Sequence, residues 1–306
     1  MTKSASAAPS PVILRPALLA GLAIAIGGAV LFSTKAIVAK LMYRYNVDAI
    51  TVIALRMIFS VPVFAGIAWW QMRTKPPLSN ADRWRMVSLG LVGYYLSSTL
   101  DFLGLQFISV GLERLILFLT PTFVLLFTSI FLKRHISALQ WAALAVAYCG
   151  IVLVFAHDLQ NGTASVVAGS LLVLGSAIAY AVYLLLSGEL VQRIGATRLV
   201  SYAMCVASAA CLAQFFVLRP ASMLVQTAPV YWLSLINGIF CTLLPVFMTM
   251  VAVQRIGAAT ASQAGMIGPV STLFLGALVL GEPITAIQLG GTALVLGGIY
   301  MLSRKK

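Results

Sequence analysis

Apolar runs of about 20 residues, separated by short polar segments, recur along the whole chain. A helix needs about 20 predominantly apolar residues to cross the hydrocarbon core of a bilayer. Ten runs have about this length, at residues 17–39, 48–70, 86–105, 108–131, 138–156, 166–188, 199–218, 230–252, 258–280 and 286–302. The connections between them are short, so the backbone polar groups must be satisfied inside helices. The pattern predicts an all-α integral membrane protein with ten transmembrane helices.

The composition agrees with this pattern. Of the 306 residues, 61% are hydrophobic and 9% are charged, and the mean hydropathy is +1.02. Soluble proteins have about 25% charged residues, so this composition excludes an ordinary soluble domain and a disordered chain. Four cysteines are scattered through the apolar runs without CxxC spacing, at Cys149, Cys205, Cys211 and Cys241. They are interpreted as packing residues, and neither a metal site nor a cofactor is expected.

The basic residues predict the orientation in the membrane. The formal net charge is +13, but the positive residues lie in short segments between apolar runs, where they report topology rather than nucleic-acid binding. If the runs cross alternately, one side holds only Lys40, Arg44 and Arg219. The other side holds fourteen: Lys3, Arg15, Arg73, Lys75, Arg83, Arg85, Lys133, Arg134, Arg193, Arg198, Arg255, Arg304, Lys305 and Lys306. The tail at 1–16 and the basic tail at 303–306 are therefore both expected in the cytoplasm.

An internal repeat divides the chain into two halves. A gap-free shift of 148 residues superposes Gly21 on Gly169, Gly27 on Gly175, Trp84 on Trp232, Gly90 on Gly238, Gln106 on Gln254, Pro121 on Pro269, Gln140 on Gln288 and Gly150 on Gly298. The ten runs then fall into two sets of five, at 17–156 and 165–302. Because five is odd, the second set enters the membrane from the opposite side. Two inverted five-helix repeats are typical of secondary transporters, with the substrate site near the midplane between the halves.

Particular motifs add a family resemblance. Each half has a proline in its fourth run, Pro121 in FLTPTF and Pro269 in MIGPVS, and the second half closes with Leu280–Gly281–Glu282–Pro283. With the five-plus-five repeat and very short loops, the chain resembles the drug/metabolite transporter (DMT) superfamily. It is most similar to the EamA-type branch and, within it, to the YddG-type amino-acid exporters. The first half departs from this pattern, with Lys133 and Arg134 where the second half has Gly281 and Glu282.

The resemblance implies the DMT/EamA fold, a location in the bacterial cell inner (plasma) membrane, and export of aromatic and other neutral amino acids and related small metabolites. Its members also move nucleotide sugars, quaternary amines and other metabolites. The small-molecule substrate and the lipid bilayer are the expected partners. Two complementary halves in one chain are compatible with a functional monomer.

Five ionisable residues fall inside the apolar runs: Lys35, Arg56, Asp101, Glu113 and Arg114. All belong to the first repeat, and their partners under the 148-residue shift are uncharged. A charge at the centre of a membrane helix costs about 2.5–3.5 kcal/mol on insertion scales, so such residues are candidates for function. In one interpretation, an arginine holds a substrate carboxylate and a carboxylate holds an ammonium group or a coupling proton. In the other, the charges pair among themselves and only fasten the first four helices together, with Lys35 extending to the interface.

A second constellation of candidates is uncharged. Hydroxyl and aromatic side chains within the runs could line a cavity for an amphipathic solute, because pockets are mostly apolar with a few placed polar groups. Together with Asp101, these candidate substrate-binding residues are Tyr94, Tyr95, Ser98, Tyr180, Tyr183, Phe240, Thr242, Gln263 and Met266. The alternative is that the aromatic rings only pack between helices or lie in the interfacial belt. Pro121 and Pro269 are candidate kinks that could bend a gate, because proline removes a backbone donor.

These observations predict a secondary transporter that exports amino acids by alternating access. No glycine-rich loop with the spacing of a Walker motif is present, so no ATPase is expected in this chain. Efflux of cationic drugs such as quaternary amines is the nearest alternative, favoured if Asp101 or Glu113 faces the cavity unpaired. An integral membrane enzyme acting on a lipid-linked substrate is a further alternative. No HExxH or GxSxG motif supports it, so neither catalytic residues nor enzyme activity is expected.

Overall fold

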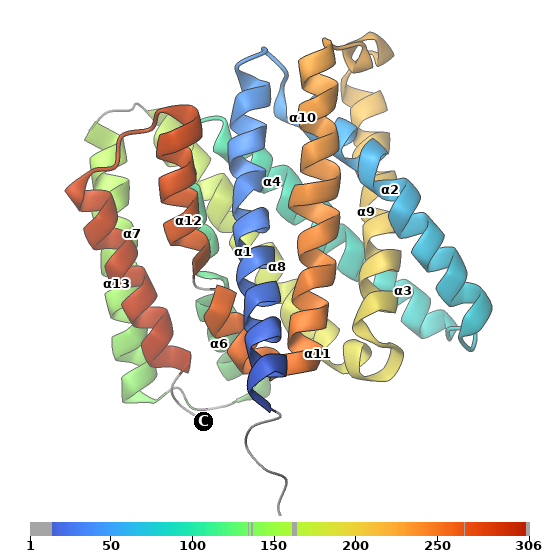
Figure 1. Ribbon diagram of the computed structural model, residues 1–306, viewed down its shortest axis with the longest axis horizontal. Helices are drawn as coiled ribbons and strands as arrows, with labels where there is room; N and C mark the ends of the chain where they lie inside the picture. The colour runs from blue at the N-terminus through green and yellow to red at the C-terminus, as the bar shows by residue number, and fades with distance from the viewer. Residues whose placement is uncertain (1–13, 134, 136, 161–163, 266, 304–306) are drawn as a thin grey trace, which may run out of the picture.

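A computed structural model describes residues 14–133, 135, 137–160, 164–265 and 267–303, and helices make up almost all of this part of the chain (Figure 1). The first half contains α1 (Leu14–Tyr43), α2 (Ala49–Thr74), α3 (Asn80–Gly90), the π-helical turn η1 (Leu91–Leu96), α4 (Ser97–Leu105), α5 (Val110–Leu117), α6 (Thr120–Leu132) and α7 (Ala138–Gln160). The second contains α8 (Ala164–Ile194), α9 (Ala196–Leu218), the 3₁₀ turn η2 (Ala221–Leu224), α10 (Ala228–Gly238), the π-helical turn η3 (Ile239–Leu243), α11 (Leu244–Gly265), α12 (Ile267–Leu275), the π-helical turn η4 (Gly276–Leu280) and α13 (Ala286–Ser303). The predicted all-helical class is confirmed.

Eight helical segments in the described ranges are long and apolar enough to cross a membrane. Two shorter apolar segments, Ile267–Leu280 and Ala286–Met301, follow them. They fall where the ninth and tenth runs were predicted. One boundary differs from the expectation: α11 continues through Arg255 to Gly265, where a loop was expected between the eighth and ninth runs. The run 252–265 has no proline, and its alanines favour a continuous helix.

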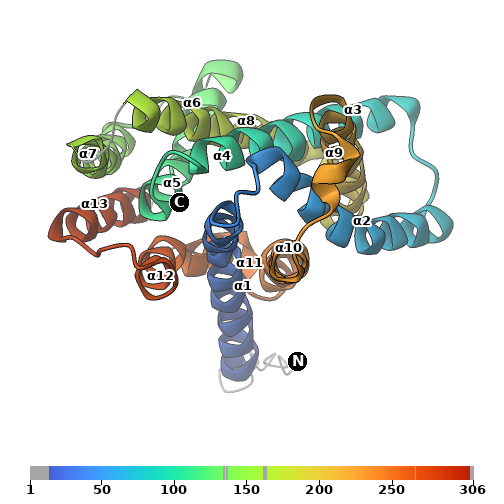
Figure 2. The same cartoon turned by 90° about the horizontal axis from the view of Figure 1, so that it is seen from above.

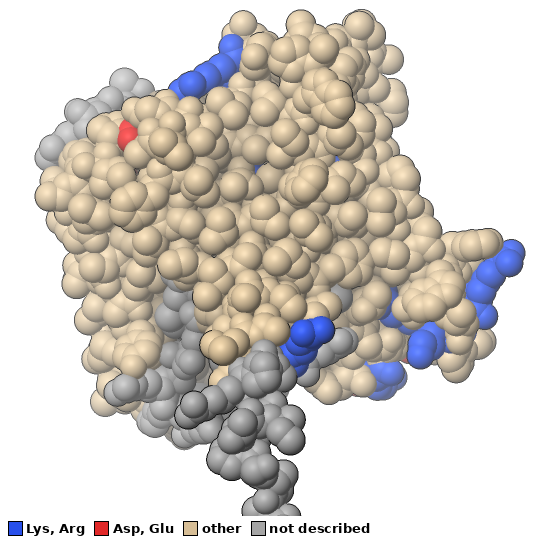
Figure 3. Space-filling model, viewed as in Figure 1, with Lys and Arg blue, Asp and Glu red and all other residues tan. Residues whose placement is uncertain are grey.

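The helices lie roughly along one direction, and α1 begins at the end of the bundle where α13 finishes (Figure 1). Seen along the bundle, α7 lies beside α13, α1 beside α11, and α2 beside α9 (Figure 2). Each of these pairs joins one half of the chain to the other, so the halves interlock. On the face shown in Figure 3, basic side chains gather near the two ends of the bundle, with few between them. This distribution suits a molecule whose middle faces lipid.

The helix boundaries follow the 148-residue shift that the sequence matches suggested. The segment α3–η1–α4 begins at Asn80 and α10–η3–α11 begins at Ala228, and α7 and α13 begin at Ala138 and Ala286. The π-helical turns begin at Leu91 and Ile239 and therefore keep the same register. These elements of the second half keep the register of the first, whereas the break between α4 and α5 has no counterpart in α11 and η4 has none in α6.

The matched glutamines cap equivalent helices. At the start of α7, the Ser137 amide donates to the Gln140 side chain at 2.9 Å, and the Gln140 amide donates back to the Ser137 hydroxyl at 3.4 Å. At the start of α13, Thr285 and Gln288 exchange the same two bonds at 3.3 and 3.2 Å. Both are capping boxes, which satisfy amide donors that a helix start leaves free.

The matched glycines allow the halves to approach closely. A Cβ atom on Gly150 of α7 would lie 2.5 Å from the Gly291 carbonyl oxygen of α13, and one on Gly298 of α13 would lie 2.5 Å from the Ala143 carbonyl oxygen of α7. No side chain fits at these distances. Small residues at such positions let two membrane helices pack backbone against backbone. The repeat therefore encodes the contact between the halves.

Candidate functional site

The five predicted intramembrane charges are all buried. Lys35 on α1 and Arg56 on α2 are 5% exposed, Asp101 on α4 is 2%, and Glu113 and Arg114 on α5 are 0% and 3% exposed. The α5 residues follow a helix start capped by the Ser109 hydroxyl, which accepts from the Leu112 amide at 3.1 Å. Four helices of the first half thus bring their charges into the interior, although these residues are far apart in sequence.

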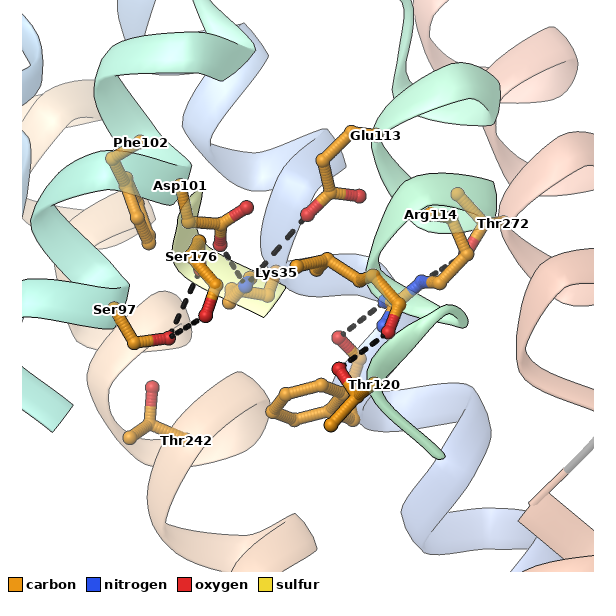
Figure 4. A network of polar contacts seen from close by, with 12 residues as sticks. Lys35, Ser97, Asp101, Phe102, Glu113, Arg114, Thr120, Ser176, Thr242 and Thr272 are labelled. Carbon is orange, nitrogen blue, oxygen red and sulfur yellow. Dashed lines mark hydrogen bonds and ion pairs between the residues drawn. The ribbon is translucent and has the colours of Figure 1, made fainter. Parts of the chain in front are cut away.

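Lys35 lies between the two carboxylates (Figure 4). Its ammonium group forms an ion pair with Asp101 and lies 3.8 Å from Glu113 Oε1. The rings of Phe32 and Phe102 lie 5.2 and 5.5 Å from the same nitrogen. Within the described ranges, Asp101 Oδ1 and both Glu113 oxygens have no hydrogen-bond partner. One cation therefore faces two anions, and Glu113 is the less completely satisfied of them.

Arg114 connects three helices without a carboxylate. Its Nε donates to the Thr272 hydroxyl of α12 at 3.1 Å and its Nη2 donates to the Phe32 carbonyl of α1 at 3.0 Å (Figure 4). Its guanidinium group also lies 5.2 Å from the centre of the Phe32 ring. Among the residues that the structure describes, no Asp or Glu lies within ion-pair distance of it.

Arg56 contacts the π-helical turn of the second half. Its Nε donates to the Thr242 hydroxyl at 2.8 Å, and this hydroxyl donates to the Asn237 carbonyl at 2.8 Å, five residues earlier in the chain. The Phe102 ring lies 5.1 Å from the guanidinium carbon. In the described part of the chain, Arg56 Nη1 and both polar atoms of the Asn237 side chain are buried without hydrogen-bond partners, and no carboxylate pairs with Arg56.

Asn237 was not among the residues predicted from the sequence. It is 0% exposed and lies directly before Gly238, whose Cβ position would be 2.9 Å from the Arg56 carbonyl oxygen. Its amide group inside an apolar run was the available signal. Buried polar groups usually have a partner, so the unpaired Arg56 and Asn237 atoms mark a place where a ligand could be bound.

Three predicted tyrosines lie together at the other π-helical turn. Tyr94 of η1 and Tyr183 of α8 approach to 3.3 Å between hydroxyl oxygens, and their ring centres are 5.0 Å apart. Tyr180 lies 5.5 Å from Tyr183 in a stacked arrangement. Gly93 permits this packing, because a Cβ atom there would overlap the Tyr183 ring. The three tyrosines pack on the buried cluster of Met86, Leu89, Leu190 and Leu199, and Tyr94 also packs against the cluster that contains Phe102.

The remaining candidates are placed differently. Tyr95 and Ser98 are partly exposed, Thr242 is 3% exposed, and Phe240 is 49% exposed on η3. The hydrogen bonds between Ser97 and Ser176, which join α4 to α8, were not anticipated (Figure 4). Met266 lies outside the described residues, and so does the side chain of Gln263.

The two candidate prolines lie in the equivalent helices α6 and α12. Pro121 is in the first turn of α6, and α5 ends at Leu117, so the fourth run is broken immediately before the proline. Pro269 lies near the start of α12. Proline suits the first turn of a helix because the amide it lacks would have no partner there. In the first half, the proline thus follows directly on an interruption between two helices.

A pocket of about 350 Å³ lies at the end of the bundle opposite the start of α1. It is lined by Lys40, Tyr43, Arg44, Gln106, Leu280 and Glu282. The Tyr43 hydroxyl donates to the Phe102 carbonyl at 2.8 Å, next to Asp101. Burial raises the pKa of Glu282, while nearby Lys40 opposes this effect.

Comparison with known proteins decides the family. The sequence profile of the EamA-like transporter family matches the chain twice, at residues 19–156 and 167–304. The chain belongs to the EamA-like transporter family. The match covers both halves, so this EamA protein contains a tandem repeat of the family domain, as the DMT fold requires.

Similar proteins have related descriptions. The uncharacterized transporter YcbK of Bacillus subtilis is 32% identical over 285 residues, covering 90% of this chain and 88% of the relative. An uncharacterized transporter of Archaeoglobus fulgidus is 27% identical and covers 86% of this chain and 92% of its own length. One solved crystal structure superposes with a TM-score of 0.63 at 16% identity, over 92% of this chain and 96% of that one, which supports the fold. The family and these names indicate a multi-pass membrane transporter rather than an enzyme.

Proposed function

We propose that this EamA protein is a secondary transporter of the bacterial inner membrane that exports amino acids and related small metabolites carrying a carboxylate. Alternating access between the two interlocked halves moves the solute, and both chain termini face the cytoplasm. One observation supports this substrate class above all: Arg56 is buried, has no carboxylate partner among the described residues, and keeps an unpaired Nη1.

The balance of buried charges supports an anionic group on the solute. Lys35 faces Asp101 and Glu113, while Arg56 and Arg114 have no carboxylate partner in the part of the chain described. These five buried residues therefore carry three positive and two negative charges. A buried charge without a counter-charge is costly, and a substrate carboxylate would supply one. The guanidinium fork suits a carboxylate better than an ammonium group would.

The neutral part of the solute has suitable surroundings as well. Tyr94, Tyr180 and Tyr183 offer aromatic rings and hydroxyl groups, and Asn237 offers an amide. A site that combines a cation, an amide and aromatic rings suits an amphipathic solute of amino-acid size.

Efflux of cationic drugs is the second candidate, and Glu113 is the observation that favours it. Neither of its oxygens has a hydrogen-bond partner within the described ranges. However, Lys35 lies 3.8 Å from this carboxylate and Arg114 is the next residue in the chain. These two cations would repel a cationic solute, so we favour the carboxylate-bearing substrate.

The test is counterflow in proteoliposomes that contain the full chain. Vesicles preloaded with one unlabelled amino acid should take up the labelled amino acid across a panel of aromatic and neutral examples. Arg56→Gln should remove the exchange, whereas the matched variant Arg219→Gln, which changes a partly exposed arginine beside Asp48, should retain it. Exchange of quaternary amines but not of amino acids by the wild type would contradict the proposal and support the second candidate.

A further inference from the structure

A second pocket lies at the end of the molecule where α1 begins, away from the charge cluster. Its volume is about 540 Å³, and it is bounded by the connection between α2 and α3 and by the turn between α8 and α9. Half of its lining residues are polar: Lys75, Ser79, Asp82, Arg193 and Arg198. No step of the proposed transport uses these residues. The pocket therefore calls for its own explanation.

The charges in this pocket are unbalanced. Asp82, the one carboxylate among the lining residues, forms an ion pair with Arg193. Lys75 and Arg198 remain without a carboxylate partner among the described residues. Three basic residues and one carboxylate thus leave the lining residues with two positive charges in excess. The pocket is suited to an anion.

Arg198 is the residue that distinguishes this pocket from a basic surface. It is only 6% exposed, its Nη2 donates to the Pro76 carbonyl at 2.8 Å, and its Nε is buried without a hydrogen-bond partner in the described chain. The bond to Pro76 and the contact of its guanidinium group with the Tyr202 ring, at 5.9 Å, hold the side chain in place. A buried and pre-positioned guanidinium group with an unused donor binds phosphate well.

Two helix starts add partial positive charge. The α3 helix begins after Ser79, whose hydroxyl accepts from the Asp82 amide at 3.1 Å, so this start is already capped. The α9 helix begins after Gly195, which has no side chain to cap it. The start of a helix attracts anions through these amides and through the helix dipole. The α9 start and Arg198, in its first turn, therefore act on the same ligand.

The floor and the surroundings of the pocket place it at the membrane surface. Leu78 and Ile194 line its base and pack on the buried cluster that contains Met86, Leu190 and Leu199. Nearby, Trp69, Trp70 and Trp84 are 54%, 59% and 72% exposed. Exposed tryptophans at helix ends are typical of the lipid headgroup level. Basic pockets between helices on the cytoplasmic side bind phosphate-bearing lipid headgroups.

We propose that this pocket binds a phosphate group at the membrane surface, held by Arg198, Lys75 and the start of α9. The phosphate belongs either to an anionic phospholipid or to a free phosphate in the aqueous phase. The site is separate from the transport site, so it stands whether or not amino acids are the transported solute.

The test compares thermal unfolding of the full chain in detergent with added phosphatidylglycerol, phosphatidylcholine or inorganic phosphate. Phosphatidylglycerol should raise the Tm of the wild type in a saturable way, and phosphatidylcholine should raise it much less. In Arg198→Gln the half-saturating concentration should increase about tenfold, since a hydrogen bond to a charged group contributes about 1.5–3 kcal/mol. Lys75→Gln should also raise the half-saturating concentration. Because it changes an exposed side chain, it tests the binding site even if Arg198→Gln does not fold.

Arg83→Gln is the matched control. Arg83 is an exposed residue of α3 that does not line the pocket, and the variant changes the net charge equally. It should bind like the wild type. If inorganic phosphate also raises the Tm of the wild type in a saturable way, the site binds free phosphate. If only phosphatidylglycerol does so, the site binds the phosphate of a lipid headgroup. Equal responses of the two pocket variants and the control, or no response of the wild type to either ligand, would overturn the proposal.

Discussion

The two π-helical turns η1 and η3 occupy equivalent places in the two halves, yet their surroundings differ chemically. The 148-residue shift places Tyr94 on Thr242 and Lys35 on Tyr183. At η1, a tyrosine hydroxyl meets a second tyrosine hydroxyl at 3.3 Å. At η3, a threonine hydroxyl accepts from Arg56 at 2.8 Å. The first turn is neutral and aromatic, and the second is cationic.

This difference shows which parts of the repeat are constrained. Helix caps, close-packed glycines and π-helical turns maintain the contact between the halves, so a change in one half alone would disturb the shared interface. The side chains that face the interior are not bound by this requirement. They can diverge until one side suits a charged group and the other an aromatic group. Turns of this kind inside helices often occur at functional sites.

The largest effect should come from breaking the ion pair beside the cationic turn. Asp101→Asn leaves Lys35 with only the more distant Glu113, and removal of one partner of a buried pair costs about 3–5 kcal/mol. We expect a large loss of thermal stability in detergent. The double variant Lys35→Met/Asp101→Leu should recover most of this loss. If the double variant recovers stability but not counterflow, the ion pair serves transport as well as structure. A double variant as unstable as Asp101→Asn would contradict the pairing of Lys35 with Asp101.

The next effect tests the charge of the cationic turn directly. Arg56→Met introduces the residue that occupies the equivalent position, Met204, in the second half. Loss of a charge-assisted contact of about 1.5–3 kcal/mol should weaken substrate binding 10-fold to 100-fold in a counterflow titration. Stability should be retained, because an unpaired buried charge is replaced by an apolar side chain. Unchanged substrate affinity would show that Arg56 does not bind the substrate.

A smaller effect should follow from crowding the neutral turn. Gly93→Ala places a methyl group against the Tyr183 ring and should destabilise the protein by about 1–3 kcal/mol, which thermal unfolding would report. The equivalent position in the second half already holds a side chain, Cys241, whose sulfur lies 3.0 Å from the Thr34 hydroxyl oxygen. Cys241→Ala is therefore the matched control and should cost less. A second change, Tyr183→Leu, should relieve Gly93→Ala; failure of this rescue would show that the crowding lies elsewhere.

The smallest effect should come from removing one hydroxyl of the neutral turn. Tyr94→Phe keeps the ring contacts with Tyr180 and Tyr183 and loses one hydrogen bond, which contributes about 0.5–1.5 kcal/mol. We expect a modest fall in Tm and counterflow of aromatic amino acids that remains measurable. Complete loss of transport in Tyr94→Phe would show that the hydroxyl itself contacts the solute. Both π-helical turns would then bind the solute through a polar group.

Much of the architecture could be predicted from sequence. The apolar runs anticipated the helices, and the scarce matched residues anticipated their register, because helix length and helix caps depend on local sequence. Arg255 shows the limit of this reasoning. A basic residue between two apolar runs indicated a loop, yet α11 continues through it, since a helix needs only a favourable backbone and room for one exposed side chain.

The candidate site shows the same division. Lys35, Asp101 and Arg56 could be recognised from sequence because a charge in an apolar run is conspicuous without any knowledge of its neighbours. The sequence does not reveal which of them pair, because the partners are far apart along the chain. Lys35 and Asp101 are 66 residues apart, and Arg56 and Thr242 are 186 residues apart. Sequence alone sufficed for the membrane, the helices and the tandem repeat. Only the folded chain decides which charge lacks a partner, because that depends on distances between helices.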